Sequence, residues 1–306
     1  MLALTAAGHA MRVELTELPD PQPLPSEALI EVRAMSLNRG EIKRLEAAEP
    51  GAPTGWDVAG TVIRAAADGS GPPEGARVVG LSYPPRGWAQ RVPISTDVLA
   101  QIPDSVSFEQ ASCLPVAGLT ALRALEHVGF VLGRRIAVTG ASGGVGHFAI
   151  QLARDAGADV VAVARRTEGL AELGAAEVVQ ELAPAGEPLD AVLDGIGGPV
   201  LGAAIQRVRS DGTIISYAST VTDPVTYPTR ALFGQSPGAK VYGLLLFHEL
   251  RIGLDGSRGL ARLARRIGEG RLDVQIDMTL SWRQANDAIA ALLDRRVKGK
   301  AVLTVD

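Results

Sequence analysis

The sequence has 306 residues but only one cysteine, Cys113, and it has no long apolar run. A single thiol excludes an internal disulfide and is typical of proteins in a reducing compartment. A membrane-spanning helix needs ~20 consecutive apolar residues, and no stretch of the chain approaches that length. Met1–Ala10 also lack the basic start and long apolar core of a signal peptide. These absences predict a cytoplasmic protein without membrane contacts.

A strong excess of charge is missing as well. The formal net charge is −4, basic residues form no run, and they do not alternate with aromatic residues, which make up 4% of the chain. Nucleic-acid-binding proteins usually carry a basic patch, so nucleic acid is not an expected partner. The length suffices for two domains or for one large α/β domain.

What the chain does contain is a glycine-rich turn between an apolar strand and a helix. Ile136–Thr139 is a short β-branched run, which predicts a buried strand. Glycines follow at positions 140, 143, 144 and 146, and apolar residues then recur at helical spacing as far as Ala156. A second predicted strand, Asp159–Ala164, comes directly afterwards. This order is typical of a dinucleotide-binding βαβ unit.

In such a unit the glycines let the backbone turn tightly and approach a pyrophosphate, and the helix N-terminus supplies N–H groups. An ordinary connection without a ligand is the alternative, because glycine-rich turns are common. The cofactor-binding residues predicted in this turn are Ser142, Gly143, Gly144, Val145 and Gly146.

The end of the second predicted strand bears on the choice of cofactor. An NAD site usually has an Asp or Glu there, about 20 residues after the glycines, to bind the ribose hydroxyl. This chain has Arg165 and Arg166 instead, with no acid before Glu168. Guanidinium groups bind a phosphate well but offer a hydroxyl no acceptor. The two arginines therefore favour NADPH over NADH, and a solvated basic turn is the alternative.

The spacing of strands and helices predicts an α/β fold. Many short strands with Gly/Pro turns precede residue 103, which indicates a β-rich, partly barrel-like first domain. From Arg135 onward strands alternate with helices, which indicates a doubly wound parallel sheet. The six strands predicted for this sheet are Ile136–Thr139, Asp159–Ala164, Glu177–Gln180, Ala191–Asp194, Thr213–Tyr217 and Val241–Phe247. The tail after residue 260 has no sheet of its own, so we expect it to return to the first domain.

Several motifs in order along the chain carry a family resemblance. They include Ser36-Leu-Asn38, Gly55-Trp-Asp-Val-Ala-Gly60, Leu114-Pro-Val-Ala-Gly-Leu-Thr-Ala121, Val138-Thr-Gly-Ala-Ser-Gly-Gly-Val-Gly146, Asp190-Ala-Val-Leu-Asp194 and Lys298-Gly-Lys-Ala-Val-Leu303. In this order they resemble the zinc-independent branch of the medium-chain dehydrogenase/reductases, the quinone oxidoreductase (zeta-crystallin-like) group.

The resemblance implies a GroES-like catalytic domain built from both chain ends, residues 1–111 and 248–306, around a Rossmann domain at 112–247. It implies a cofactor between the two domains and a homodimer formed through the last Rossmann strand. Thr120 matches a threonine beside the nicotinamide in relatives, although ordinary helix packing is its alternative. We also expect Asp194, at a strand end, and Gly243 to contact the cofactor; a turn cap is the alternative for Asp194.

The resemblance also bears on metal. Zinc relatives use Cys, His and carboxylate ligands, and catalytic zinc needs about three converging side chains. Ser36 and Leu37 stand where relatives have a Cys-His pair, and Trp56 stands at the other His position. We therefore expect no metal.

Without a metal, hydride transfer needs an acceptor that is already electrophilic, such as a quinone or an α,β-unsaturated carbonyl. Asn38, the Asn of the Ser-Leu-Asn motif, is the first candidate for the hydrogen bond to the substrate oxygen; capping of the next helix is its alternative. Many relatives follow this Asn with a tyrosine, which is absent here. Tyr83 is therefore a candidate proton donor or, alternatively, a wall residue of the site, with bulk water as another source of the proton.

The leading hypothesis is an NADPH-dependent reductase acting on a small hydrophobic quinone or enone. A pathway-dedicated enoyl reductase for a cyclic or polyketide-like intermediate is a second hypothesis. A non-catalytic NADPH-binding protein is the third. His127 and His248 are expected to be structural.

Overall fold

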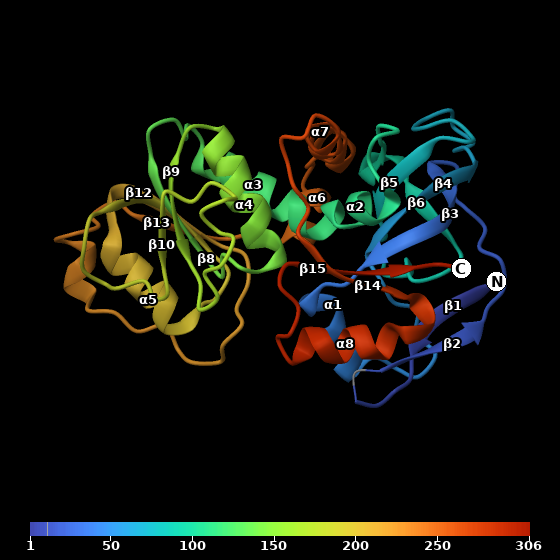
Figure 1. The fold of residues 1–306 in the computed structure, drawn as a ribbon, viewed down its shortest axis with the longest axis horizontal. Coiled ribbons are helices and arrows are strands. Elements are labelled where there is room, and N and C mark those ends of the chain that lie inside the picture. Colours follow the sequence, from blue (N-terminus) through green and yellow to red (C-terminus); the bar gives the residue numbers. More distant parts are fainter. Residues whose placement is uncertain (11) are drawn as a thin grey trace. The chain divides into compact units, whose positions relative to one another are not determined.

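The computed structural model describes residues 1–10 and 12–306, which divide into two compact units. The first unit consists of Met1–Leu119 together with Leu254–Asp306, and the second is Thr120–Gly253. The α/β fold class predicted from the sequence is confirmed, because both units combine helices with the expected kinds of sheet (Figure 1).

Within its described residues, the first unit has a seven-stranded sheet and a separate hairpin. The sheet order is β14-β15-β3-β4-β5-β7, with β6 paired to β3 as well. The hairpin is β1 (Leu2–Ala6) with β2 (Val13–Glu17). The sheet strands are β3 (Glu27–Ser36), β4 (Asp57–Arg64), β5 (Arg77–Leu81), β6 (Arg91–Ser95), β7 (Leu99–Gln101), β14 (Ile276–Ser281) and β15 (Lys300–Thr304). β15 pairs antiparallel with β3, so the C-terminal tail lies in the same sheet as the N-terminal segment.

The helices of the first unit flank this sheet. Figure 1 shows α7 and α8 on opposite sides of β14 and β15. The α-helices are α1 (Arg39–Arg44), α2 (Phe108–Ser112), α7 (Gly256–Gly268) and α8 (Ala285–Leu293). A π-helix, η3 (Leu114–Gly118), follows α2, and short 3-10 turns are η1 (Leu45–Ala47), η2 (Thr96–Val98) and η5 (Trp282–Gln284). α2 lies against β3, β4 and β5, which places residues 108–112 in this unit. The observed boundaries therefore fall at Leu119 and Gly253, whereas the sequence prediction put them at Ala111 and Phe247.

The second unit, all of whose residues are described, holds a six-stranded parallel sheet with the order β10-β9-β8-β11-β12-β13. The strand order reverses between β8 and β11, which is the arrangement of a dinucleotide-binding sheet. The strands are β8 (Arg135–Thr139), β9 (Asp159–Val163), β10 (Glu177–Val179), β11 (Leu189–Asp194), β12 (Val208–Ser216) and β13 (Lys240–Gly243). The helices are α3 (Leu119–Val128, which begins at the boundary), α4 (Gly144–Asp155), α5 (Gly198–Arg207), α6 (Leu246–Arg251) and the 3-10 turn η4 (Thr229–Leu232).

Helices cover both faces of this sheet, and the middle residues of its central strands are accordingly apolar. α4 packs on β8 and β9, and α5 packs on β11 and β12; Figure 1 shows the two helices on opposite faces. Val161, Val192 and Ile214, from three different strands, lie in one buried core.

One predicted strand is shorter than expected. The apolar run Val241–Phe247 was predicted to be extended, but β13 ends at Gly243 and α6 begins at Leu246. Leu246 and Glu249 are buried on this helix, so a 3.6-residue period replaces the strand period there. None of the helices in the described residues is both long and apolar enough to cross a membrane.

Candidate active site

The glycine turn of the second unit has the geometry of a phosphate-binding turn. β8 ends at Thr139, Gly140 takes a left-handed φ of +66°, and Gly143 is the N-cap of α4. A Cβ on Gly146 would lie 2.5 Å from the Ala141 carbonyl oxygen and 2.6 Å from that of Gly140. Only glycine allows the helix to start this close to the turn, and the first-turn N–H groups then point out along the helix axis. These residues fit a nucleotide phosphate.

The two arginines follow β9 after one residue, and Arg166 lies near His147 of α4. Arg165 is exposed and Arg166 is half-buried. His147 in the first turns of α4 is only 7% exposed, and its burial, with the positive charge of Arg166, lowers the pKa of His147 to about 4. The imidazole is therefore neutral at neutral pH, and the positive charge of this corner comes from the guanidinium groups. Their predicted role in binding a 2′-phosphate stays a prediction.

The other predicted cofactor residues lie at the carboxyl ends of strands or in α3. Asp194 ends β11 and is fully buried; it accepts hydrogen bonds from Thr139 Oγ1 (2.6 Å), Gly197 N (3.1 Å) and Ser216 Oγ (3.3 Å). It therefore ties three strand ends together and closes a turn. Gly243 is the exposed last residue of β13. Thr120 is the second residue of α3 and is 6% exposed.

Tyr217, which the sequence prediction did not include, follows β12 at the same edge. Its hydroxyl donates to the Thr139 carbonyl oxygen at 3.3 Å. Burial and the nearby Asp194 carboxylate raise the pKa of Tyr217 above the ordinary range, so it stays a neutral donor.

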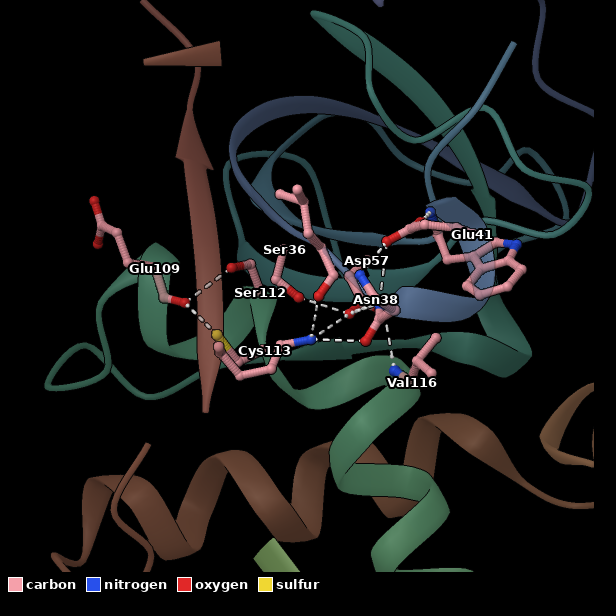
Figure 2. A network of polar contacts seen from close by, with 11 residues as sticks. Ser36, Asn38, Glu41, Asp57, Glu109, Ser112, Cys113 and Val116 are labelled. Atoms are coloured by element: carbon pink, nitrogen blue, oxygen red, sulfur yellow. Dashed lines mark hydrogen bonds and ion pairs between the residues drawn. The ribbon is translucent and has the colours of Figure 1, made fainter. Parts of the chain in front are cut away.

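The first unit contains a buried polar network centred on Asp57, the first residue of β4 (Figure 2). Asp57 is fully buried. Its Oδ2 accepts from Ser36 Oγ and from Asn38 Nδ2, each at 2.7 Å. Its Oδ1 accepts from the Val116 N–H of the π-helix at 2.9 Å. The register of the sheet creates this network, because Ser36 of β3 pairs with Asp57 of β4.

Lys300 brings a positive charge into the same network. It is 3% exposed, and its Nζ donates to Asn38 Oδ1 at 2.7 Å and to the Leu37 carbonyl oxygen at 3.1 Å. Nζ also lies 3.5 Å from Asp57 Oδ2. Lys300 opens β15, two residues before the Val302–Ser36 pair of β15 and β3. The amide oxygen of Asn38 thus accepts from an ammonium group, and its amide nitrogen donates to a carboxylate.

Glu41 is the third ionisable side chain of the network. Its Oε1 accepts from the Asn38 N–H at 2.6 Å, and its Oε2 accepts from the Trp56 N–H at 2.9 Å. Burial, together with the nearby Asp57 carboxylate, raises the pKa of Glu41 to about 8. Asn38 is the N-cap residue of α1, so its capping position and its place in the network are both observed.

The donor set of this network does not fit zinc. In residues 1–10 and 12–306, no three His, Cys, Asp or Glu side chains come together in a way that could hold a metal ion. Cys113 is the chain's one cysteine, and burial raises its pKa to about 12, so its sulfur is a protonated thiol. Asp57 is satisfied by Ser36, Asn38 and an ammonium group, where a metal site would need further anionic or imidazole ligands.

Tyr83, the other predicted catalytic residue, lies near the same end of the sheet. Leu81 of β5 pairs with Asp57, and the Ser82 N–H donates to the Trp56 carbonyl oxygen at 2.7 Å. Tyr83 follows in the loop and is 52% exposed. The structure therefore brings Asn38 and Tyr83 to one end of the first unit, and their catalytic roles stay predictions.

The sequence prediction missed Asp57, Lys300 and Glu41 as site residues. Two signals were available. Asp57 and Lys300 each open an otherwise apolar run, which places a charge where a buried strand begins. Glu41 stands three residues after an N-cap Asn, the spacing of a capping box.

Comparison with known proteins agrees with this architecture. The zinc-binding dehydrogenase family matches residues 156–303. A chloroplast envelope quinone oxidoreductase homolog of Arabidopsis thaliana is 30% identical over 321 aligned positions, covering 97% of this chain and 95% of that protein. The trans-enoyl reductase tazE of Aspergillus terreus is 29% identical, covering 71% of this chain and 76% of that protein. The structure of a quinone oxidoreductase from Coxiella burnetii has a TM-score of 0.85 and 29% identity, covering 100% of this chain and 99% of that one.

The chain therefore belongs to the quinone oxidoreductase-type medium-chain dehydrogenase/reductases, as the sequence motifs predicted. Its fold is a Rossmann unit combined with a GroES-like unit, and its chemistry is that of a nicotinamide-dependent reductase of the quinone or enoyl type.

Proposed function

We propose that the protein is an NADPH-dependent reductase that transfers hydride, without zinc, to a quinone or an α,β-unsaturated carbonyl compound. The observation that carries this proposal is the Asp57 network. Where a metal would polarise a substrate oxygen, the chain offers the Asn38 amide, whose oxygen accepts from the Lys300 ammonium group. Such a donor suits a substrate whose carbon is already electrophilic and whose oxygen needs only hydrogen bonding.

NADPH, when bound, supplies the hydride. The glycine turn at the start of α4 would hold its pyrophosphate, and Arg165 and Arg166 would hold its 2′-phosphate. Asn38 would donate to the substrate oxygen as negative charge develops there. Tyr83, exposed in its loop, would deliver a proton to the resulting enolate or hydroquinone anion.

The cofactor part of the proposal is tested by titrating the protein with NADPH and, separately, with NADH, using tryptophan quenching. We expect tight NADPH binding and weak NADH binding. Arg165→Ala should raise the dissociation constant for NADPH by about 10-fold to 100-fold, because one charge-assisted contact to phosphate is lost. Its effect on NADH should be less than about 2-fold. Equal effects on both cofactors would contradict the 2′-phosphate assignment.

The substrate part of the proposal needs a panel of quinones and enones. Rapid turnover of simple quinones would support the general reductase. If the protein does not reduce quinones but turns over a larger enoyl substrate, it is a pathway-dedicated enoyl reductase. The name of one relative, the trans-enoyl reductase tazE, favours this alternative. NADPH binding without oxidation on any acceptor would leave the non-catalytic alternative.

We also propose a cytoplasmic homodimer formed through β13. This strand is the edge of the parallel sheet, and Val241 on it is 55% exposed. An uncovered apolar edge strand is an association surface. Val241→Lys should shift the sedimentation coefficient from that of a dimer to that of a monomer; an unchanged coefficient would contradict this assignment.

A further inference from the structure

We infer that Lys300 strengthens Asn38 as the hydrogen-bond donor to the substrate oxyanion, acting through the Asn38 amide. The inference rests on the proposed function, in which a substrate oxygen gains negative charge as hydride arrives. Lys300 is in this sense a positioning and polarising residue, because it acts on Asn38 and not on the substrate.

The first support is the direction of the Lys300 ammonium group. The residue is 3% exposed, and its Nζ reaches Asn38 Oδ1 (2.7 Å), the Leu37 carbonyl oxygen (3.1 Å) and Asp57 Oδ2 (3.5 Å). An ammonium group has three N–H donors, so these three acceptors use all of them. Lys300 therefore has no donor left for a substrate.

The second support is the chemistry of the amide between the two groups. The oxygen and nitrogen of an amide are conjugated, so a cation on Oδ1 draws electron density away from Nδ2. The Nδ2 hydrogens become more positive and bind an anion more strongly, as in other chains of hydrogen bonds in a low-dielectric interior. Asn38 is half-buried, whereas Lys300 and Asp57 are buried, so Asn38 is the member of this chain nearest to solvent.

The third support is that one of the two hydrogen bonds donated by Asn38 Nδ2 can be exchanged for a bond to the substrate. One donates to Asp57 Oδ2 at 2.7 Å, which fixes the amide plane. The other reaches Glu41 Oε1 at 3.3 Å, and that oxygen already accepts the Asn38 N–H at 2.6 Å. A substrate oxygen can replace this longer bond while Glu41 keeps its shorter one. The network thus presents one polarised N–H for the reaction.

The arrangement differs from metal catalysis in how the positive charge acts. A metal ion binds the substrate oxygen directly. Here a fixed ammonium group, neutralised on one side by Asp57, acts through one amide. Its contribution should therefore be large for acceptors that need oxyanion stabilisation and small for acceptors that are strongly electrophilic.

The test compares acceptors that differ in electrophilicity. Lys300→Met should lower kcat for the least electrophilic member of a para-substituted chalcone series by on the order of 100-fold, and kcat for a simple quinone by less than about 5-fold, with KM nearly unchanged. Lys300→Arg should restore part of the loss. Lys298→Met, at an exposed position two residues earlier, is the matched control and should behave as wild type.

Two further measurements distinguish the proposed role of Lys300 from a folding defect in the variant. The pair Asp57→Asn with Lys300→Met removes both charges together, so no buried carboxylate is left uncompensated, and it should show the same selective loss. In wild type with NADP⁺ bound, binding of substituted phenolates should tighten as their basicity rises. This dependence should be weaker in Lys300→Met. Melting curves and NADPH fluorescence establish that each variant is folded and loaded.

The outcomes separate the inference from the proposed function. A wild-type protein that reduces no acceptor overturns the proposed function, whatever Lys300 does. An active wild type whose Lys300→Met variant loses the same factor on chalcones and quinones, or loses nothing, overturns the role of Lys300. A further loss when Lys300→Met is added to Asn38→Ala would also overturn it, because the effect would then bypass the amide.

Discussion

Glu41 in the first unit and Glu249 in the second are both nearly inaccessible, with exposed fractions of 1% and 0%. The pKa values of their carboxyl groups are nevertheless shifted in opposite directions. Burial, with the Asp57 carboxylate nearby, raises the pKa of Glu41 to about 8. Burial acts in the same direction on Glu249, but hydrogen bonds from Tyr242, Arg123 and His127 outweigh it and lower the pKa of Glu249 to about 2.

The two carboxyl groups differ in their hydrogen-bond partners. Glu41 accepts from the neutral backbone N–H groups of Asn38 and Trp56, and the nearby ammonium of Lys300 is bonded to Asn38 and Asp57. Glu249 accepts from the Arg123 guanidinium at 2.5 Å and from His127 Nε2 at 3.1 Å. Direct bonds from a cation and from further donors favour the ionised form of a buried carboxyl group, as they do at Glu249.

Removing the cation of the second unit should have the largest effect. Arg123→Met leaves the buried Glu249 carboxylate without its guanidinium partner. We expect the free energy of unfolding at pH 7 to fall by about 3 kcal/mol, the low end for a broken buried pair, since Arg123 is partly exposed. Urea denaturation measures this change.

The stability difference between this variant and the wild type should shrink in acid. A depressed pKa stabilises the fold above the unfolded value near 4.5, and that stability is lost as the pH falls toward about 2. Without Arg123 the folded pKa of Glu249 lies closer to the unfolded value, so the variant should lose less stability than the wild type as the pH falls. Arg265→Met is the control, because its ion pair with Glu269 is exposed and 3.9 Å long, and it should change stability by less than about 0.5 kcal/mol. If Arg123→Met and Arg265→Met lost the same stability, Glu249 would not depend on a direct guanidinium partner, and it would no longer differ from Glu41.

Replacing Glu41 should change the pH dependence of stability in the opposite sense. The folded protein keeps a proton on Glu41 that the unfolded chain releases, so wild-type stability should decline as the pH rises from about 4.5 to about 8. Glu41→Gln resembles the protonated acid at all pH values. It should reduce that decline by about 2 kcal/mol, measured by urea denaturation at pH 5 and pH 8.

An exposed glutamate in the same region is the control for this experiment. Glu46→Gln, in η1, should keep the wild-type pH dependence. If Glu41→Gln lowers stability equally at both pH values, Glu41 is ionised in the folded state and the two buried glutamates are alike.

The smallest effect is expected from the neutral donor to Glu249. Tyr242→Phe removes the hydroxyl that bonds Glu249 and keeps the ring, which lies 4.2 Å from the His127 ring between centroids. We expect a loss of about 1 kcal/mol in the free energy of unfolding. Because Tyr242 and Arg123 donate to the same carboxylate, Tyr242→Phe should change the free energy of unfolding by a different amount in the Arg123→Met variant than in the wild type. Additive effects would show that the two donors act independently.

The local parts of the fold and site were predictable from the sequence. The turn at Gly140–Gly146, the helix after it and the strands on either side follow from glycine positions and apolar spacing over a few residues. The sequence did not predict the helix at Leu246–Arg251, because an apolar run of this length has no decisive period. The contact of Glu249 with Arg123, which is distant in the chain, is visible only in the structure. Asp194 illustrates an ambiguity of the same kind, since a strand-end carboxylate can close a turn or bind a ligand; the turn is observed, and the cofactor contact stays a prediction.

The sequence by itself determined the family, the α/β class and the glycine-rich turn, because each motif and each apolar period behind them lies within a short stretch of the chain. Only the tertiary structure brought Lys300 to Asp57, 243 positions away, and placed both against Asn38. Sheet register made those contacts, since β3 pairs with β4 on one side and with β15 on the other. The charge state of Glu41 was decided at the same level, because a pKa depends on burial and on which charges lie nearby in space.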